Sequence, residues 1–203
     1  MRLLPCGDVG LLVEVADLDE VLALYAELED LRPEGVVDMV PAARTLLLTI
    51  DPAITTPTTV ATVVRGATPR PGTRPHAGEI EVPVTYDGPD LAEVASLTGM
   101  SEREVVAVHT EQEWTVAFCG FAPGFGYMVC SDERLTVPRR RDPRTAVPPG
   151  SVAVAGGFSS VYPRESPGGW QLIGRTDVVA WDLTRDPPAL FSPGVRVRFV
   201  EAR

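Results

Sequence analysis

The chain has 203 residues, of which 44% are hydrophobic and 23% charged, which suits one large domain or two small ones with packed cores. Its formal net charge of −10 disfavours nucleic acids and anionic membranes as partners, and no segment approaches the ~20 apolar residues of a membrane span. All 18 basic residues are arginine, so the chain lacks the lysine of a P-loop, a Schiff base or a kinase ATP site.

Residues 1–68 predict a small α+β domain. Asp17 and Glu20 have the spacing of a helix capping box, and apolar residues from Leu18 to Leu28 then recur at helical intervals. The expected elements are a strand at 9–15, a helix from Leu18, strands at 36–40 and 45–50, and a helix at 58–64. The β-branched side chains of the segment 58–64 disfavour this last helix.

The run from Gly66 to Pro75 is rich in proline and glycine and cannot hold a helix or a central strand. We therefore predict a linker at 69–77, followed by a second domain at 78–203. Apolar residues alternate with polar ones from Ile80 to Tyr86, as in a half-buried strand, and Pro83 favours an edge position.

The second domain has the pattern of a mainly-β fold. Asp90 and Ser101, the latter with Glu104 in capping-box position, predict the starts of two short helices. Short strands are then expected at 115–118, 151–155, 178–183 and 195–199, with turn residues between them. This spacing is typical of a barrel or a sandwich.

Three Gly/Pro-rich signatures lie between Phe118 and Thr176. They are Phe-Cys-Gly-Phe-Ala-Pro-Gly-Phe-Gly-Tyr at 118–127, the Pro-Arg-rich segment 138–151, and Ser-Pro-Gly-Gly-Trp-Gln-Leu-Ile-Gly-Arg-Thr at 166–176. Glycine and proline place the backbone, aromatic rings offer stacking walls and arginines supply fixed cations, so the signatures predict a binding pocket.

Two groups of residues have both a structural and a chemical interpretation. His109 borders the apolar face of the second short helix, where it is either a packed core residue or a proton donor. The cluster Arg139, Arg140, Arg141 and Arg144 is either a solvated loop or a site for a carboxylate, phosphate or carboxybiotin.

The third signature is open to two interpretations as well. Gly168 and Gly169 either permit a tight hairpin or let backbone amides converge on an oxyanion, with Trp170 or Phe125 as a flat wall. If 171–175 is a regular strand, Gln171 and Arg175 share one face and point to the pocket.

These signatures resemble those of the family that contains the B subunit of 5-oxoprolinase, the allophanate hydrolase subunit 1 proteins and the kinase inhibitor KipI. Gly7-Asp8 and the segment 86–91 also fit, so the resemblance covers nearly the whole chain, and it extends to half of the carboxyltransferase domain of urea carboxylase. It implies a cyclophilin-like barrel for 78–203. The chain departs from the family pattern at Phe158-Ser159-Ser160, at Val195 and at Trp114.

The resemblance also implies site residues, because His109, Arg139 and Arg144 match positions of the family motifs. We expect three catalytic residues, His109 as proton donor with Arg144 and Arg175 at the oxyanion. The solvated arginines would be Arg140 and Arg141. The expected substrate-binding residues are Phe125, Tyr127, Arg139, Gly168, Gly169, Trp170 and Gln171.

The function implied is that of the small subunit of a hetero-oligomeric 5-oxoprolinase. Such a complex opens the lactam 5-oxoproline to glutamate, consumes ATP as a substrate and contains a larger partner related to allophanate hydrolase subunit 2. One alternative is a biotin-dependent urea or amide carboxyltransferase or an allophanate hydrolase-like complex, and another is a KipI-like inhibitor of a histidine kinase. Three cysteines without metal-ligand spacing fit a cytoplasmic protein with no metal site.

Overall fold

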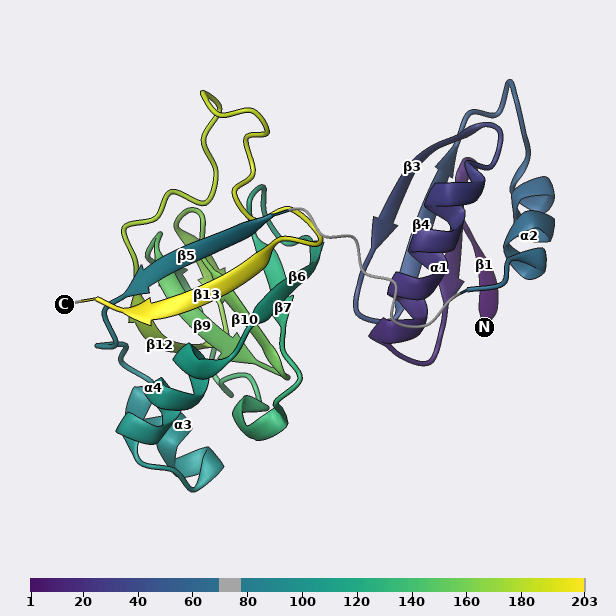
Figure 1. Ribbon diagram of the computed structural model, residues 1–203. Coiled ribbons are helices and arrows are strands. Elements are labelled where there is room, and N and C mark those ends of the chain that lie inside the picture. Colours follow the sequence, from purple (N-terminus) through teal and green to yellow (C-terminus); the bar gives the residue numbers. More distant parts are fainter. Residues whose placement is uncertain (70–77, 203) are drawn as a thin grey trace. The chain divides into compact units, whose positions relative to one another are not determined.

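The computed structural model describes residues 1–69 and 78–202 and is drawn as a ribbon in Figure 1. The chain divides into two compact units, 1–75 and 76–203. The linker expected at 69–77 lies outside the described residues, apart from Pro69.

The first unit is a four-stranded antiparallel sheet with two helices packed on one face (Figure 1). The strand order is β1-β2-β4-β3. The elements are β1 (Arg2–Cys6), β2 (Gly10–Glu14), α1 (Leu18–Leu31), β3 (Val36–Pro41), β4 (Thr45–Ile50) and α2 (Pro57–Gly66). The core lies between the sheet and the helices, where alternate residues of β2 and β4 meet the apolar faces of α1 and α2.

Both helices begin where local chemistry predicts. Asp17 accepts a hydrogen bond from the Glu20 amide at 2.9 Å, and the Glu20 carboxylate accepts one from the Ala16 amide at 3.0 Å. The β-branched helix at 58–64 forms within α2, because Val60 and Val64 are buried in the core and this burial outweighs their low helix propensity.

The second unit is a nearly closed barrel of mixed strands. Its seven-stranded sheet has the order β12-β9-β10-β7-β6-β13-β5, and all pairs are antiparallel except β13 with β5. The two ends of this order meet where Thr85 and Arg175 exchange two backbone hydrogen bonds of 2.8 and 2.9 Å. The strands are β5 (Glu79–Val84), β6 (Trp114–Cys119), β7 (Gly126–Val129), β9 (Ser151–Ala155), β10 (Phe158–Val161), β12 (Gln171–Arg175) and β13 (Arg196–Glu201).

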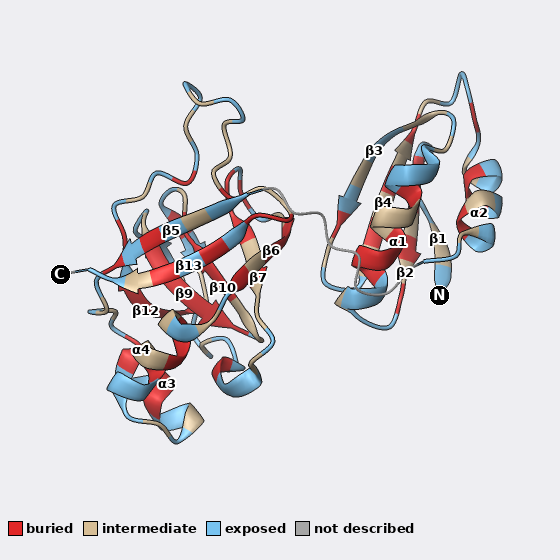
Figure 2. Cartoon of the chain, in the orientation of Figure 1, coloured by how far each residue is buried: buried red, intermediate tan, exposed pale blue. Residues whose placement is uncertain are grey.

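Two cores lie on opposite sides of this sheet. Val152 and Val154 of β9 face the barrel interior, where they join the apolar faces of α3 (Leu91–Thr98) and α4 (Glu102–Glu111). Ala153 and Ala155 face outward into a second cluster with Val147 of β8 (Arg144–Val147), which pairs with β11 (Ser166–Gly168). Figure 2 shows the buried residues concentrated along the barrel strands.

The structure corrects two expected elements. No strand forms at 178–183, because a turn at Asp182 folds the segment back so that only Trp181 forms a bridge, with Ala189. Val179 and Leu183, whose apolar character suggested the strand, are 56% and 80% exposed. The Ser101–Glu104 capping box is present, but the Asp90 side chain makes no capping hydrogen bond to α3.

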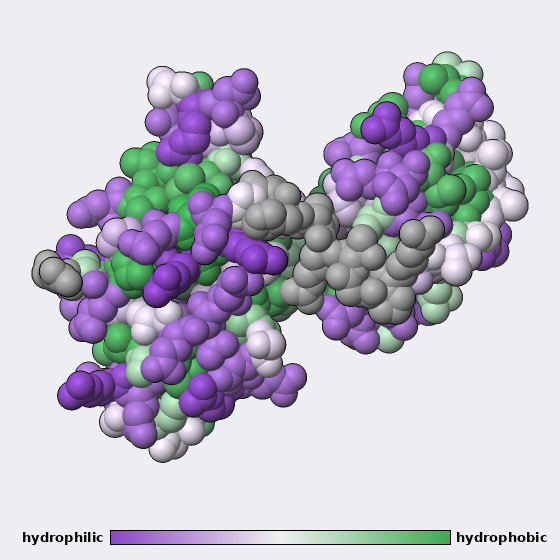
Figure 3. All heavy atoms as spheres, in the orientation of Figure 1, coloured by the Kyte–Doolittle hydropathy of each residue, from purple (hydrophilic) through white to green (hydrophobic). Residues whose placement is uncertain are grey.

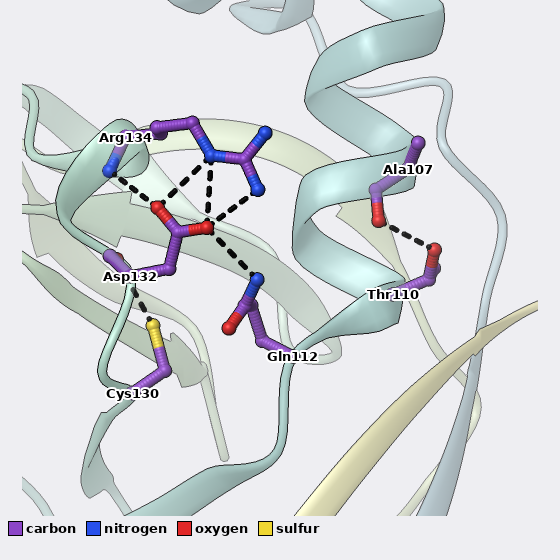
Figure 4. A network of polar contacts seen from close by, with 6 residues as sticks. All are labelled: Ala107, Thr110, Gln112, Cys130, Asp132 and Arg134. Atoms are coloured by element: carbon purple, nitrogen blue, oxygen red, sulfur yellow. Dashed lines mark hydrogen bonds and ion pairs between the residues drawn. The ribbon is translucent and has the colours of Figure 1, made fainter.

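A polar network fixes the turn after β7 to the end of α4 (Figure 4). The Asp132 carboxylate accepts a hydrogen bond from Gln112 Nε2 at 3.0 Å and is held by Arg134 of the short 3₁₀ helix η1 (Glu133–Leu135). Cys130 Sγ donates to the Asp132 carbonyl at 3.2 Å.

Hydrophilic residues cover much of the visible surface of both units, with smaller apolar patches between them (Figure 3). Within the described residues, no helix combines the length and apolar character that a bilayer crossing requires. The same residues contain no group of three His, Cys, Asp or Glu side chains placed to hold a metal ion.

Candidate functional site

Aromatic side chains of the first and third signatures form one connected cluster on the outer face of the barrel. Phe125, Tyr127 and Trp170, all predicted substrate-binding residues, contact one another with ring centroids 5.1 to 5.5 Å apart. Phe118 stacks on Tyr127 at 4.5 Å, and Tyr162 meets Phe125 edge-on at 5.3 Å. Edge-to-face contacts at these distances hold rings in fixed orientations. Phe125 and Trp170 are buried, so the cluster is a packed apolar core, and Tyr127 is only partly buried.

Phe121 is the exposed member of this cluster, and its place was not predicted from the sequence. Its backbone is left-handed, with φ at 66°, and its side chain is 56% exposed while it contacts Phe125 at 5.1 Å. A bulky residue is rare in this conformation, and such strain persists where the surrounding structure imposes it. Hydrogen bonds at both ends of the loop, from Ala122 N to Gly120 O and from Gly120 N to Phe125 O, impose it here.

Arg139 is an exposed cation whose charge acts on two phenols of the aromatic cluster. Burial raises the pKa of Tyr127 and of Tyr162, and the positive charge of Arg139 opposes the rise at both phenols. Across residues 1–69 and 78–202 the Arg139 side chain has no hydrogen bond or ion pair. A planar cation without a protein partner is suited to bind an anion of a ligand.

Arg144 and Arg140 differ from Arg139, because a buried carboxylate holds both. Arg144 Nη1 and Nη2 donate to the two oxygens of Asp90 at 2.8 Å each, and Arg140 Nη1 donates to Asp90 Oδ1 at 2.6 Å. The Leu172 amide donates to Asp90 Oδ2 at 2.7 Å. The expectation that Arg140 is solvated is therefore wrong.

The electrostatics of this network favour a charged Asp90. The Asp90 side chain is only 3% exposed, and burial alone would raise its pKa. The hydrogen bonds from Arg144 and the Leu172 amide, with the charges of Arg144 and Arg140, outweigh burial and lower the pKa. Asp90 thus joins the start of α3 to β8 and β12, and it fixes the position of Arg144.

Gln171 and Arg175 face opposite sides of the sheet, so the expectation that they share a face is wrong. A β-bulge interrupts β12 between Leu172 and Gly174, and an extra residue reverses the alternation of side chains. Gln171 lies opposite Val154 and is 3% exposed, with Nε2 donating to the Pro138 carbonyl at 3.3 Å. Arg175 lies opposite Ser151 and makes an exposed pair with Asp87 at 2.9 Å.

The two glycines of the third signature have different surroundings. A Cβ at Gly168 would lie 2.3 Å from Tyr162 Oη, so the absence of a side chain there lets the hydroxyl pack against the backbone. A Cβ at Gly169 would find its nearest neighbour, Pro143, at 3.6 Å. The Gly169 carbonyl accepts a hydrogen bond from the Arg140 amide at 2.7 Å.

His109 lies in the barrel core, away from the aromatic cluster. Its side chain is fully buried, with Nδ1 2.7 Å from Tyr86 Oη and Nε2 2.8 Å from Ser159 Oγ. Burial lowers its pKa to about 3, so the ring is neutral near pH 7. Both nitrogens are occupied and no part of the ring is exposed, which favours the packing role over the proton-donor role.

The sequence model of the carboxyltransferase domain, subdomain C and D, matches residues 1–191 of this chain. The chain belongs to this family. Its three signatures, which supply the aromatic cluster, the Arg139 to Arg144 segment and Gln171, lie within the matched region.

A family member from Escherichia coli O157:H7, named as the B subunit of 5-oxoprolinase, is 50% identical over 129 residues, which are 62% of this chain and 59% of the relative. Two further relatives carry the same name. The chain thus spans less than two thirds of the length of the curated relatives that it matches.

Solved structures agree on the fold. The crystal structure of TTHA0988 is 36% identical with a TM-score of 0.79, and the match covers 96% of this chain and 40% of that chain. The urea amidolyase of K. lactis has a TM-score of 0.81 at 20% identity over 98% of this chain and 15% of that chain. This last likeness shows that the fold, with its nearly closed barrel, is shared.

Proposed function

We propose that this chain is the small subunit of a cytoplasmic, ATP-dependent 5-oxoprolinase that opens 5-oxoproline to glutamate. The observation that carries the proposal is the 50% identity to a relative named as the B subunit of that enzyme. The proposal includes domains at 1–68 and 78–203, the second a cyclophilin-like barrel, and a larger partner related to allophanate hydrolase subunit 2.

The geometry of the barrel domain supports a small planar substrate with a carboxylate. In the proposed complex the ring of 5-oxoproline lies against the exposed Phe121 and the partly buried Tyr127, and the buried rings of Phe125 and Trp170 support these two side chains. Arg139, which has no protein partner in the described residues, binds the carboxylate. Arg144 positions the Arg139–Arg140 segment through Asp90.

Opening a lactam requires stabilisation of the carbonyl oxyanion and protonation of the nitrogen. In this proposal the amides near Gly168 and Gly169 and the guanidinium of Arg175 remain candidates for the oxyanion. His109 is enclosed in the core, so the nitrogen receives its proton from a group of the partner. The partner also binds ATP, because this chain has no lysine with which to build a phosphate loop.

The test is to purify the chain with its native partner and to measure ATP hydrolysis that depends on 5-oxoproline. We expect activity from the complex and none from the isolated chain. Arg139→Gln should raise KM at least tenfold, whereas Arg141→Gln, an exposed neighbour, should leave KM unchanged. Full turnover by the isolated chain, or a complex whose ATP hydrolysis ignores 5-oxoproline, would overturn the proposal.

A second candidate is a biotin-dependent carboxyltransferase acting on urea or a related amide, which the description of the matched family favours. In that case the complex should require a biotinylated carrier, and Arg139 would bind carboxybiotin. If the complex requires neither ATP with 5-oxoproline nor biotin, the remaining candidate is a KipI-like inhibitor of a histidine kinase. That activity would be measured as a loss of kinase autophosphorylation.

A further inference from the structure

Two buried polar atoms, one in the Asp90 network and one on the residue before Leu172, have no hydrogen-bond partner among the described residues. One is the donor Arg140 Nε and the other is the acceptor Gln171 Oε1. Native structures rarely leave such atoms unpaired, because each has lost its hydration without a replacement. One unpaired donor and one unpaired acceptor are the two kinds of atom that an amide group needs as partners.

The two atoms come from segments that run side by side. The Pro138 carbonyl accepts from Gln171 Nε2 at 3.3 Å, and the Arg140 amide donates to the Gly169 carbonyl at 2.7 Å. These two bonds hold the segment 138–140 against the segment 169–171, so Arg140 and Gln171 lie on two joined segments. The amide orientation of Gln171 is fixed, because only Nε2 can donate to a carbonyl, so Oε1 is the free atom.

Arg140 is the member of this network that can move. Its side chain is 32% exposed and has one hydrogen bond to Asp90, whereas Arg144 has two. When Arg140 leaves, Arg144 and the Leu172 amide still pair both oxygens of Asp90. The cost of moving Arg140 is therefore small compared with that of moving Arg144.

We propose that Arg140 and Gln171 bind the amide group of the substrate. Arg140 turns from Asp90 and donates to the amide carbonyl, and Gln171 Oε1 accepts the amide N–H. A lactam is suited to this arrangement, because its ring holds the amide cis and presents carbonyl and N–H at the same edge. The inference rests on the proposed function for the identity of the lactam, and it makes Arg140 and Gln171 specificity residues distinct from Arg139.

Three probes separate the contacts: 5-oxoproline, 2-pyrrolidinone, which has the lactam without the carboxylate, and cyclopentanecarboxylate, which has the carboxylate and neither the carbonyl nor the N–H of the lactam. Dissociation constants are measured by calorimetry on the chain purified with its partner. Gln171→Met keeps the side-chain length and Arg140→Lys keeps the ion pair with Asp90. Both variants should weaken binding of 5-oxoproline and 2-pyrrolidinone roughly tenfold or more and leave binding of cyclopentanecarboxylate unchanged. Arg139→Gln, the matched control, should weaken binding of 5-oxoproline and cyclopentanecarboxylate and leave binding of 2-pyrrolidinone unchanged.

A general loss of folding would weaken all three probes equally, so the pattern across probes is the readout. The inference is overturned if the unmodified complex binds no probe, or if Gln171→Met and Arg140→Lys change the binding of cyclopentanecarboxylate as much as that of the lactams or change nothing. Failure of the proposed function has a different signature, since it removes 5-oxoproline-dependent ATP hydrolysis whatever the binding pattern.

Discussion

Replacing Asp90 with asparagine should destabilise the barrel unit by about 3 kcal/mol. Each Asp90 oxygen accepts two hydrogen bonds, so whichever oxygen becomes an NH₂ group, two donors lose their acceptor. A bond to a charged partner contributes about 1.5–3 kcal/mol, and the arginines, 22% and 32% exposed, recover part of the loss through hydration. The expected fall in melting temperature is about 10 °C.

Tryptophan fluorescence reports this unit selectively, because Trp114, Trp170 and Trp181 all lie within it. The difference between the parent and Asp90→Asn should be constant from pH 7 to pH 5. The pKa of Asp90 is lowered on folding, so its contribution is complete above the ordinary value of 3.8 and is lost as pH falls through the folded value. The two melting temperatures should therefore converge only below pH 3.8.

Asp87→Asn is the matched control. Asp87 also pairs with an arginine, but its side chain is 48% exposed and that of Arg175 is 63% exposed, so the pair contributes about 0–1 kcal/mol. Equal, small changes in the Asp90 and Asp87 variants would refute the assignment of Asp90 as the residue that joins α3, β8 and β12.

Three further outcomes follow from the same structure. Because burial lowers the pKa of His109 to about 3, stability should fall as pH drops below 6.5 toward that value, and His109→Phe should flatten this dependence in melting experiments; an unchanged pH dependence would contradict it. Gly168→Ala should cost about 1–3 kcal/mol through contact with Tyr162 Oη, whereas Gly169→Ala should change the melting temperature little; similar costs at both positions would argue against the packing described. Phe121→Gly should preserve or raise stability, since it relieves the left-handed strain, while weakening substrate binding in calorimetry; unchanged binding would remove Phe121 from the site.

Features with local causes were predictable from the sequence. The capping residues of α1 and α4 interact with their own helix, and the glycines and aromatics of the first signature lie within ten residues of one another. Phe125, Tyr127 and Trp170 were predicted to bind substrate, with Trp170 or Phe125 as a flat wall. The structure brings the three rings into contact, and their binding role stays a prediction.

Features that depend on distant partners were not predictable. Asp90 has the appearance of a helix cap, but its partners Arg140 and Arg144 follow 50 and 54 positions later. The bulge in β12 depends on its register against β9, and no residue near Gln171 signals that the alternation reverses. The left-handed backbone of Phe121 also lacks a local signal, since glycine or asparagine normally occupies such positions.

The parallel pairing of β13 with β5 has a consequence for biosynthesis. Glu79 lies opposite Arg196, so the strand that leaves the ribosome first in this unit pairs with the one that leaves last. β13 lies between β6 and β5 in the sheet. Until β13 is synthesised, β5 has no paired strand and one edge of β6 stays unpaired, so the barrel cannot close. The first unit, whose strands pair only within residues 2–50, can complete its sheet long before, so the nascent chain should acquire structure in two separate stages.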